Sequence, residues 1–196
     1  MKKFQNKYRI PSARASWWNY AENGAYFITI CTHGRECHFG DVAIVETPNL
    51  GVSTLGTIKL SPLGEIAQHY WMEIPVHFPY IKLDAFVVMP NHIHGIIIID
   101  KSAETIVETP KLGVSTLSNE KPGGKNEHWH KGVLGVVINQ YKRICTIHCR
   151  KIQADFSWQT RFYDSIIRNT ESYNTIAEYI RNNPTKWTED RFNPSN

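Results

Sequence analysis

Two histidines separated by one residue carry the strongest chemical signal in this sequence. His92 and His94 follow a turn at Pro90 and Asn91 and open an apolar run that ends at Asp100. Side chains alternate between the faces of a strand, so both imidazoles point to the same side. Two imidazoles on one face of a rigid strand can bind a metal ion. On spacing alone, two half-buried structural histidines remain the alternative.

A second pair, His128 and His130, competes with the first as a metal site. This pair lies in the segment 119–131, which is polar and contains Gly123 and Gly124, so we predict a loop there. A ligand pair needs fixed geometry, which a packed strand supplies better than a loop. The sequence therefore favours His92 and His94.

One of the nine tyrosines stands apart from a helix core. The last predicted helix has an apolar stripe, which comprises Tyr173, Ile176, Ala177 and Ile180. At about 100° per residue, Tyr179 lies beside this stripe, and Asn183 lies one turn further on the same flank. Tyr141, in contrast, lies inside the apolar stripe of its own helix, so we expect it in the core. The alternative for Tyr179 is a structural role at the edge of the helix, with its hydroxyl directed to solvent.

These residues must be positioned by an alternation of strands and helices. Hydrophobic periodicity predicts strands over 25–32, 82–89, 92–100 and 156–168. It predicts helices over 60–80 with an interruption at Pro75, over 132–150, and over 170–183. Asn169 or Thr170 caps the last helix and Pro184 ends it. The order β-α-β-β-α-β-α predicts an α+β fold, an antiparallel sheet covered by helices.

Length and composition predict one domain over residues 1–196 with a net charge of +4. No apolar stretch is long enough to span a membrane, and the N-terminus lacks the apolar core of a secretion signal. We therefore expect a cytoplasmic protein with reduced cysteines and no membrane partner. A zinc site is a further alternative, formed by Cys37, His38, Cys145, His148 and Cys149.

The N-terminal arm, residues 1–16, is basic and contains no acidic residue. Its cations are Lys2, Lys3, Lys7, Arg9 and Arg14, and Trp17 and Trp18 follow directly. Cations followed by aromatic rings suit a DNA strand, which they hold by charge and stacking. A solvated basic tail is the alternative.

A twelve-residue segment occurs twice. Residues 44–55 return as residues 106–117, with Asn49 replaced by Lys111 as the single difference. Two distant copies with unrelated sequence between them do not make a solenoid. We predict that both are loop insertions at the surface, in places where connections are expected.

Three blocks of the chain closely resemble the REP-associated tyrosine transposases, single-tyrosine enzymes of the His-hydrophobic-His endonuclease superfamily. The blocks are residues 90–94, residues 158–164 with 167–169, and residues 179–184. The resemblance covers residues 17 to 187 apart from the repeats and the polar loop. It is specific because the three blocks occur in order and at these separations.

The resemblance implies a ferredoxin-like sheet of about four to five strands. It implies that Tyr179 is the nucleophile and that His92, His94 and Asn183 hold Mg²⁺ or Mn²⁺, with Asn182 as the alternative third ligand. The implied reaction is cleavage and transfer of single-stranded DNA beside hairpins of repetitive palindromic elements, through a 5′-phosphotyrosine. Arg161 and Arg168, within the second block, are further DNA-binding candidates. A monomer is favoured, although the family also includes dimers with exchanged helices.

Two rival functions remain at this point. A transposase-derived protein that only grips DNA hairpins keeps the basic surface but needs no catalytic site. A zinc-dependent hydrolase uses His92 and His94, but the sequence shows no carboxylate ligand near them.

Overall fold

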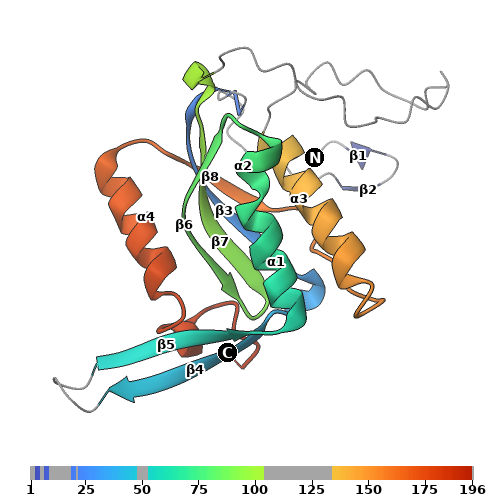
Figure 1. The fold of residues 1–196 in the computed structure, drawn as a ribbon, viewed down its shortest axis with the longest axis vertical. Helices are drawn as coiled ribbons and strands as arrows, with labels where there is room; N and C mark the ends of the chain where they lie inside the picture. Colours follow the sequence, from blue (N-terminus) through green and yellow to red (C-terminus); the bar gives the residue numbers. More distant parts are fainter. Residues whose placement is uncertain are drawn as a thin grey trace.

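A four-stranded antiparallel sheet forms the centre of the protein (Figure 1). The structure, a computed structural model, describes residues 3–4, 7–8, 19–20, 22–47, 53–103 and 134–195, and only the backbone of 3–4, 7–8, 44–47, 53–55 and 103. The strands are β3 (Gly24–Cys31), β6 (Ile81–Met89), β7 (His92–Ile99) and β8 (Tyr163–Ile167), in the order β6-β7-β3-β8. With helices between β3 and β6 and between β7 and β8, this is the ferredoxin-like arrangement. The predicted α+β fold is confirmed.

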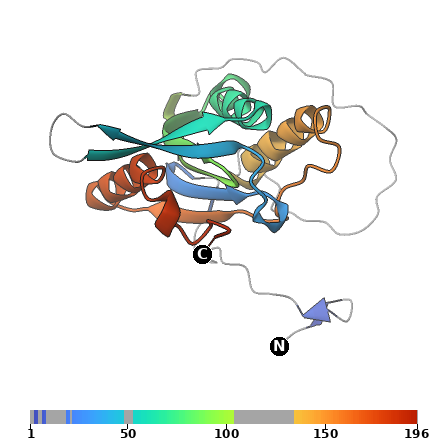
Figure 2. The ribbon, with the colours of Figure 1, turned by 90° about the horizontal axis from the view of Figure 1, so that it is seen from below.

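Helices cover both faces of the sheet (Figures 1 and 2). α1 (Pro62–Met72), α2 (Ile74–His77) and α3 (Leu134–Cys149) lie on one face, and α4 (Thr170–Asn182) lies on the other. Asn169 caps α4, as its side chain accepts a hydrogen bond from Ser172 N–H. Short 3-10 helices occur at His33–Arg35, Lys101–Ala103 and Trp187–Glu189, and β1 (Lys3–Phe4) pairs with β2 (Lys7–Tyr8).

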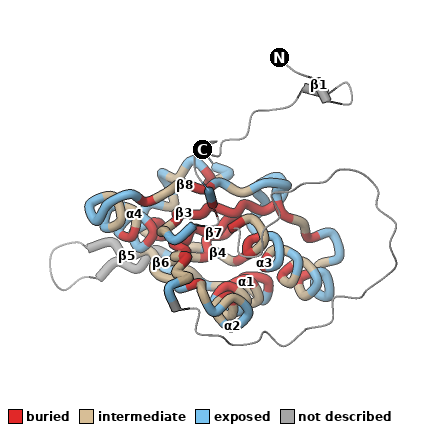
Figure 3. The backbone as a smooth tube through the Cα atoms, turned by 90° about the horizontal axis from the view of Figure 1, so that it is seen from above, coloured by how far each residue is buried: buried red, intermediate tan, exposed pale blue. Residues whose placement is uncertain are grey.

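Alternation along β7 divides the core into two layers. Ile93 and Ile97 belong to the larger cluster with α1 and α3, whereas Ile96 packs with Ala177 and Ile180 of α4. The buried parts of the chain accordingly run through the strands, and exposed residues follow the outer sides of the helices (Figure 3). His92 and His94 share the parity of Ile96, so the sheet directs them towards α4.

A β-hairpin projects from the sheet and corrects the interpretation of the first repeat. β4 (Gly40–Thr47) and β5 (Ser53–Leu60) pair antiparallel, and the register includes residues 44–47 and 53–55. The prediction of a loop over 44–55 was therefore wrong for this copy. In the sequence of this copy, β-branched residues stand on either side of Pro48, Asn49 and Gly51, a pattern that is typical of a hairpin. The second copy, 106–117, lies outside the described residues.

The predicted end of the last helix is confirmed, but its physical reason differs. Asn183 keeps helical dihedrals, φ −57° and ψ −41°, although it precedes Pro184. The helix ends because Pro184 has no N–H to continue the hydrogen-bond ladder. Asn183 consequently stays in register with Tyr179, one turn earlier on α4.

Candidate active site

His92 and His94 lie together on the α4 face of the sheet, as their spacing predicts. Their ring centroids are 4.4 Å apart, and both side chains are buried. In the sheet, His94 lies opposite Thr29 of β3, and His92 lies opposite Cys31. Because neighbouring strands surround β7 on both sides, the backbone positions of the two imidazoles are fixed.

Hydrogen bonds orient both rings. The Asn91 amide nitrogen donates to the carbonyl oxygens of Arg35 and Phe192, at 3.0 and 2.7 Å. Asn91 Oδ1 must therefore accept from His92 Nδ1, 2.8 Å away, which leaves the lone pair of His92 on Nε2. Thr29 Oγ1 lies 2.9 Å from His94 Nδ1 and holds the second ring in a similar way.

Tyr179 reaches the histidine pair from α4. Its hydroxyl lies 3.2 Å from His94 Nε2, and its ring is 43% exposed. Tyr141, in contrast, is buried and donates to the carbonyl of Ala67 at 2.9 Å. The predicted difference between the two tyrosines is confirmed: one lies in the core, and the other lies beside the imidazoles.

The C-terminal segment covers the histidines. Phe192 packs against His92 with 4.6 Å between ring centroids, and the guanidinium groups of Arg35 and Arg191 lie 4.9 and 4.8 Å from the centre of the Phe192 ring. Burial, and then the positive charge of Arg191, lowers the pKa of His94 to about 3. Burial likewise lowers the pKa of His92 well below its usual value. Both imidazoles are therefore neutral at pH 7 and can offer lone pairs to a cation.

The environment of Tyr179 keeps its hydroxyl protonated at neutral pH. Burial raises the pKa of Tyr179, and the negative charge of Asp190 raises it further. A hydrogen bond with Asn183 and the charge of Arg191 act in the opposite direction and lower this pKa. The net direction is upward, so this phenol is a poor nucleophile without help from a nearby cation.

Asp190 joins the two histidines and was missed by the sequence analysis. One ligand atom each of His92, His94 and Asp190 lies within 4.8 Å of the others. Asp190 follows the last helix and is separated from His94 by almost the whole second half of the chain, so no spacing pattern reveals it. The statement that the histidines lack a nearby carboxylate is therefore wrong.

The donor set fits a divalent cation. His92 Nε2 and Asn183 Oδ1 are buried polar atoms without a hydrogen-bond partner. Such atoms are costly inside a protein unless they bind something. Two imidazole nitrogens with an amide and a carboxylate oxygen suit Mn²⁺ and also accommodate Mg²⁺. Asn182, the alternative third ligand, is exposed, so burial favours Asn183.

A cavity of about 470 Å³ lies on the solvent side of this cluster and is not lined by the two histidines. Tyr179, Asn183 and Asp190 line it, together with Lys186 and Arg191. The hydroxyl of Tyr179 can thus meet a molecule that enters from solvent.

The remaining predicted site residues are not at this centre. Arg161 and Arg168 are both exposed. Arg161 precedes the edge strand β8, and Arg168 follows its last residue. The side chains of Lys3 and Lys7 are not described, and Lys2, Arg9, Arg14, Trp17, Trp18, His128 and His130 lie outside the described residues. Among the described residues, no further group of three or more metal ligands occurs, so the zinc alternative at the cysteines is not supported. No helix in the described part of the chain is long and apolar enough to cross a membrane.

The fold matches that of a known transposase. No protein-family model matches the chain. The chain is similar to the solved structure of a REP-associated tyrosine transposase bound to a REP hairpin, with a TM-score of 0.53 and 19% identity. The match covers 91% of this chain and 74% of that one. The predicted resemblance is confirmed at the level of the fold: this protein has the fold of a REP-associated tyrosine transposase.

A sequence relative gives the family. An uncharacterized protein of Haemophilus influenzae is 34% identical over 182 residues, which are 92% of this chain and 91% of that protein. The chain belongs to the same family as this Haemophilus protein.

Proposed function

We propose that this protein is a DNA nickase and strand transferase that acts on single-stranded DNA beside hairpins, with Tyr179 as the nucleophile. The observation that carries the proposal is the 3.2 Å approach of the Tyr179 hydroxyl to His94 Nε2, within the cluster that His94 forms with His92 and Asp190. The fold supports it, because the transposase of similar fold was solved with a REP hairpin.

In this proposal, His92, His94 and Asn183 hold the cation, and Asp190 is a candidate fourth ligand. A bound Mg²⁺ or Mn²⁺ supplies positive charge beside the scissile phosphate and offsets the charge that develops in the transition state. Asn91 and Thr29 keep the imidazoles oriented, and the pKa shifts keep them neutral.

The covalent step involves one bond made and one broken. The Tyr179 oxygen attacks phosphorus, and the bond from phosphorus to the 3′ oxygen of the preceding nucleotide breaks. The phenolic proton leaves to solvent through the cavity, and the departing oxygen gains a proton to become a free 3′-OH. The 5′-phosphotyrosine retains the energy of the phosphodiester, so the 3′-OH of another strand can reverse the step and join the ends.

The test is incubation with hairpin-flanking DNA from the protein's own genome in the presence of Mn²⁺. We expect a covalent DNA–protein adduct, and peptide mapping after nuclease digestion should place the nucleotide on Tyr179. Cleavage without an adduct, or an adduct at another residue, contradicts the proposal.

Asp190 supports one rival function. With His92 and His94 it completes a two-histidine, one-carboxylate set, which also suits a metal-dependent hydrolase. Such a hydrolase activates water and needs no tyrosine, so Tyr179→Phe should retain its turnover. Tight stoichiometric zinc together with activity in that variant favours the hydrolase.

A further inference from the structure

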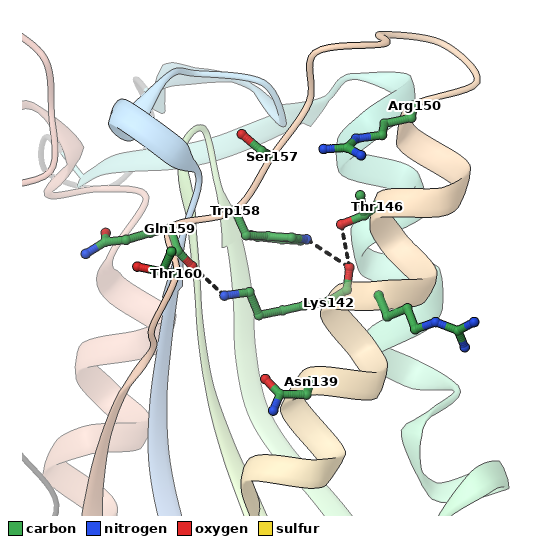
Figure 4. A pocket seen from close by; sticks show the side chains of 9 residues that line it. Asn139, Lys142, Thr146, Arg150, Ser157, Trp158, Gln159 and Thr160 are labelled. Carbon is green, nitrogen blue, oxygen red and sulfur yellow. Dashed lines mark hydrogen bonds between the residues drawn. The ribbon is translucent and has the colours of Figure 1, made fainter. Parts of the chain in front are cut away.

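A polar groove of about 290 Å³ lies between α3 and the segment that leads to β8 (Figure 4). Three cations line it, Lys142 and Arg143 of α3 and Arg150 directly after the end of α3, and none of its lining residues carries a carboxylate. Ser157 and Thr160 line it from the segment opposite α3. A groove with cations and no carboxylate in its lining has the chemistry that binds phosphates.

We propose that this groove is a second DNA-binding site, which lies away from the catalytic centre and binds the phosphodiester backbone of the substrate. The proposal rests on the proposed function, since it concerns the same substrate.

The groove has a preorganised wall. Lys142, Thr146 and Arg150 recur every four residues. Arg150 follows the last residue of α3, and its N–H still donates to the Thr146 carbonyl, so the three residues lie along one side and span about 12 Å at a rise of about 1.5 Å per residue. Trp158 Nε1 donates to the carbonyl of Lys142 at 3.2 Å, which ties the segment to the helix. A cationic line of this length can contact more than one phosphate of a DNA strand.

The cations keep unused donors. Lys142 Nζ donates one hydrogen bond to the carbonyl of Gln159, and two of its three N–H groups remain. Arg150 uses only Nε, which donates to the carbonyl of Phe156 at 2.9 Å, so its terminal nitrogens remain for a ligand. Burial lowers the pKa of Lys142 to about 8, which means that its charge is costly without an anion. A phosphate in the groove offsets that cost.

The groove is connected to the catalytic centre through the end of the sheet. Gln159 N–H donates to the carbonyl of Cys31 at 2.9 Å, and Cys31 lies opposite His92 in the sheet. The positive charges of Arg35, Arg191 and Lys142 all act on the Cys31 thiol and lower its pKa, against the larger effect of burial. The segment that lines the groove and the strand that carries His92 therefore both contact Cys31 at this end of the sheet.

The test measures DNA binding of Lys142→Gln and Arg143→Gln across a range of salt concentrations. Arg143 is exposed, so its replacement leaves the fold intact, and circular dichroism checks both variants. Lys151→Gln is the matched control, because Lys151 is exposed near the end of α3 but does not line the groove. The probes are a DNA hairpin alone, the same hairpin with a single-stranded flank, and the flank alone.

We expect each groove variant to bind several-fold more weakly and to lower the slope of log K against log[salt] by about 1. Adduct formation at saturating DNA should stay within about twofold of the wild type, because the groove does not touch the reacting atoms. Loss with the hairpin-alone probe assigns the groove to the duplex stem, and loss only with flanked probes assigns it to the single strand. If the variants bind all probes as Lys151→Gln does, the groove proposal is wrong while the proposed function stands. If the wild type binds no probe, both are wrong.

Discussion

The hydroxyl of Tyr179 lies 3.2 Å from Nε2 of His94, and Thr29 Oγ1 lies 2.9 Å from the other ring nitrogen, Nδ1. When His94 Nδ1 carries the ring proton, Nε2 has a single lone pair, which accepts from the tyrosine. A metal ion on Nε2 needs that same lone pair. A metal ion bound at Nε2 would therefore release the Tyr179 hydroxyl from its hydrogen bond and leave it available to a phosphate.

Replacing Tyr179 with phenylalanine tests this competition. We expect Tyr179→Phe to bind Mn²⁺ at least as tightly as the wild type by calorimetric titration, because no hydroxyl competes for Nε2. Hairpin binding should persist, since charge and stacking supply most of it, while cleavage and the adduct disappear. Tyr141→Phe is the control: it loses a buried hydrogen bond worth about 1 kcal/mol, melts slightly lower and still cleaves. Weaker Mn²⁺ binding in Tyr179→Phe contradicts the shared lone pair.

The two histidine pairs can be distinguished by alanine substitution. We expect His92→Ala and His94→Ala each to abolish metal-dependent cleavage, because each removes a ligand nitrogen from the buried cluster. The double variant of His128 and His130 should cleave nearly as well as the wild type. Cleavage assays with a Mn²⁺ titration decide this. The opposite pattern of activity would place the metal at the second pair.

Asn91 holds His92 in the orientation that directs Nε2 to the candidate metal site. Asn91→Ala removes the acceptor of His92 Nδ1 and leaves two backbone carbonyls without their donor. We expect unfolding to become easier by about 1–3 kcal/mol, the cost of unpaired buried polar groups. Mn²⁺ affinity should fall about 10- to 100-fold, as for other residues that orient metal-binding imidazoles. Thr29→Ser, which keeps its hydroxyl beside His94, is the control and should retain Mn²⁺ affinity; unchanged affinity in Asn91→Ala refutes the role of Asn91.

Gly56 of the hairpin supports the end of α4. Its N–H donates to Thr185 Oγ1 at 3.0 Å, and a Cβ at this position would lie 2.4 Å from the backbone of Pro184. Gly56→Ala should displace Pro184 and the adjoining Asn183, at a cost of about 1–3 kcal/mol for overpacking. We expect weaker Mn²⁺ binding and a lower melting temperature. Thr57→Ser, at the exposed neighbouring position, keeps the hydroxyl that donates to the Ala43 carbonyl and should change neither. If Gly56→Ala melts lower but binds Mn²⁺ normally, the hairpin supports the fold without positioning Asn183.

The repeat segments should be dispensable for folding. Residues 44 and 56 are cross-strand partners, so residues 45–55 are best replaced by Asn-Gly, which forms a two-residue hairpin turn. Residues 107–117 can be deleted outright. Because loop-closure entropy changes slowly with loop length, the combined variant should melt close to the wild type in a calorimetric scan. A protein that no longer folds shows that the repeats pack into the structure.

Local periodicity was sufficient to predict one half of the site and the elements that carry it. Two-residue alternation put His92 and His94 on one face of β7, because a strand directs side chains by parity alone. Helical periodicity separated Tyr179 from Tyr141 and placed Asn183 on the flank of Tyr179. These are relationships within single elements, so a short stretch of sequence contains them entirely.

The tertiary structure alone decided which face of the sheet α4 covers, and hence that Tyr179 meets His94. It also brought Asp190 and Phe192 to the histidines. Each of these contacts joins residues from different elements. They depend on how the elements pack and on the order of the strands, neither of which leaves a periodic trace in the sequence. The sequence by itself therefore determined the histidines, the tyrosine and the strands and helices that carry them, and packing between distant segments decided what surrounds them.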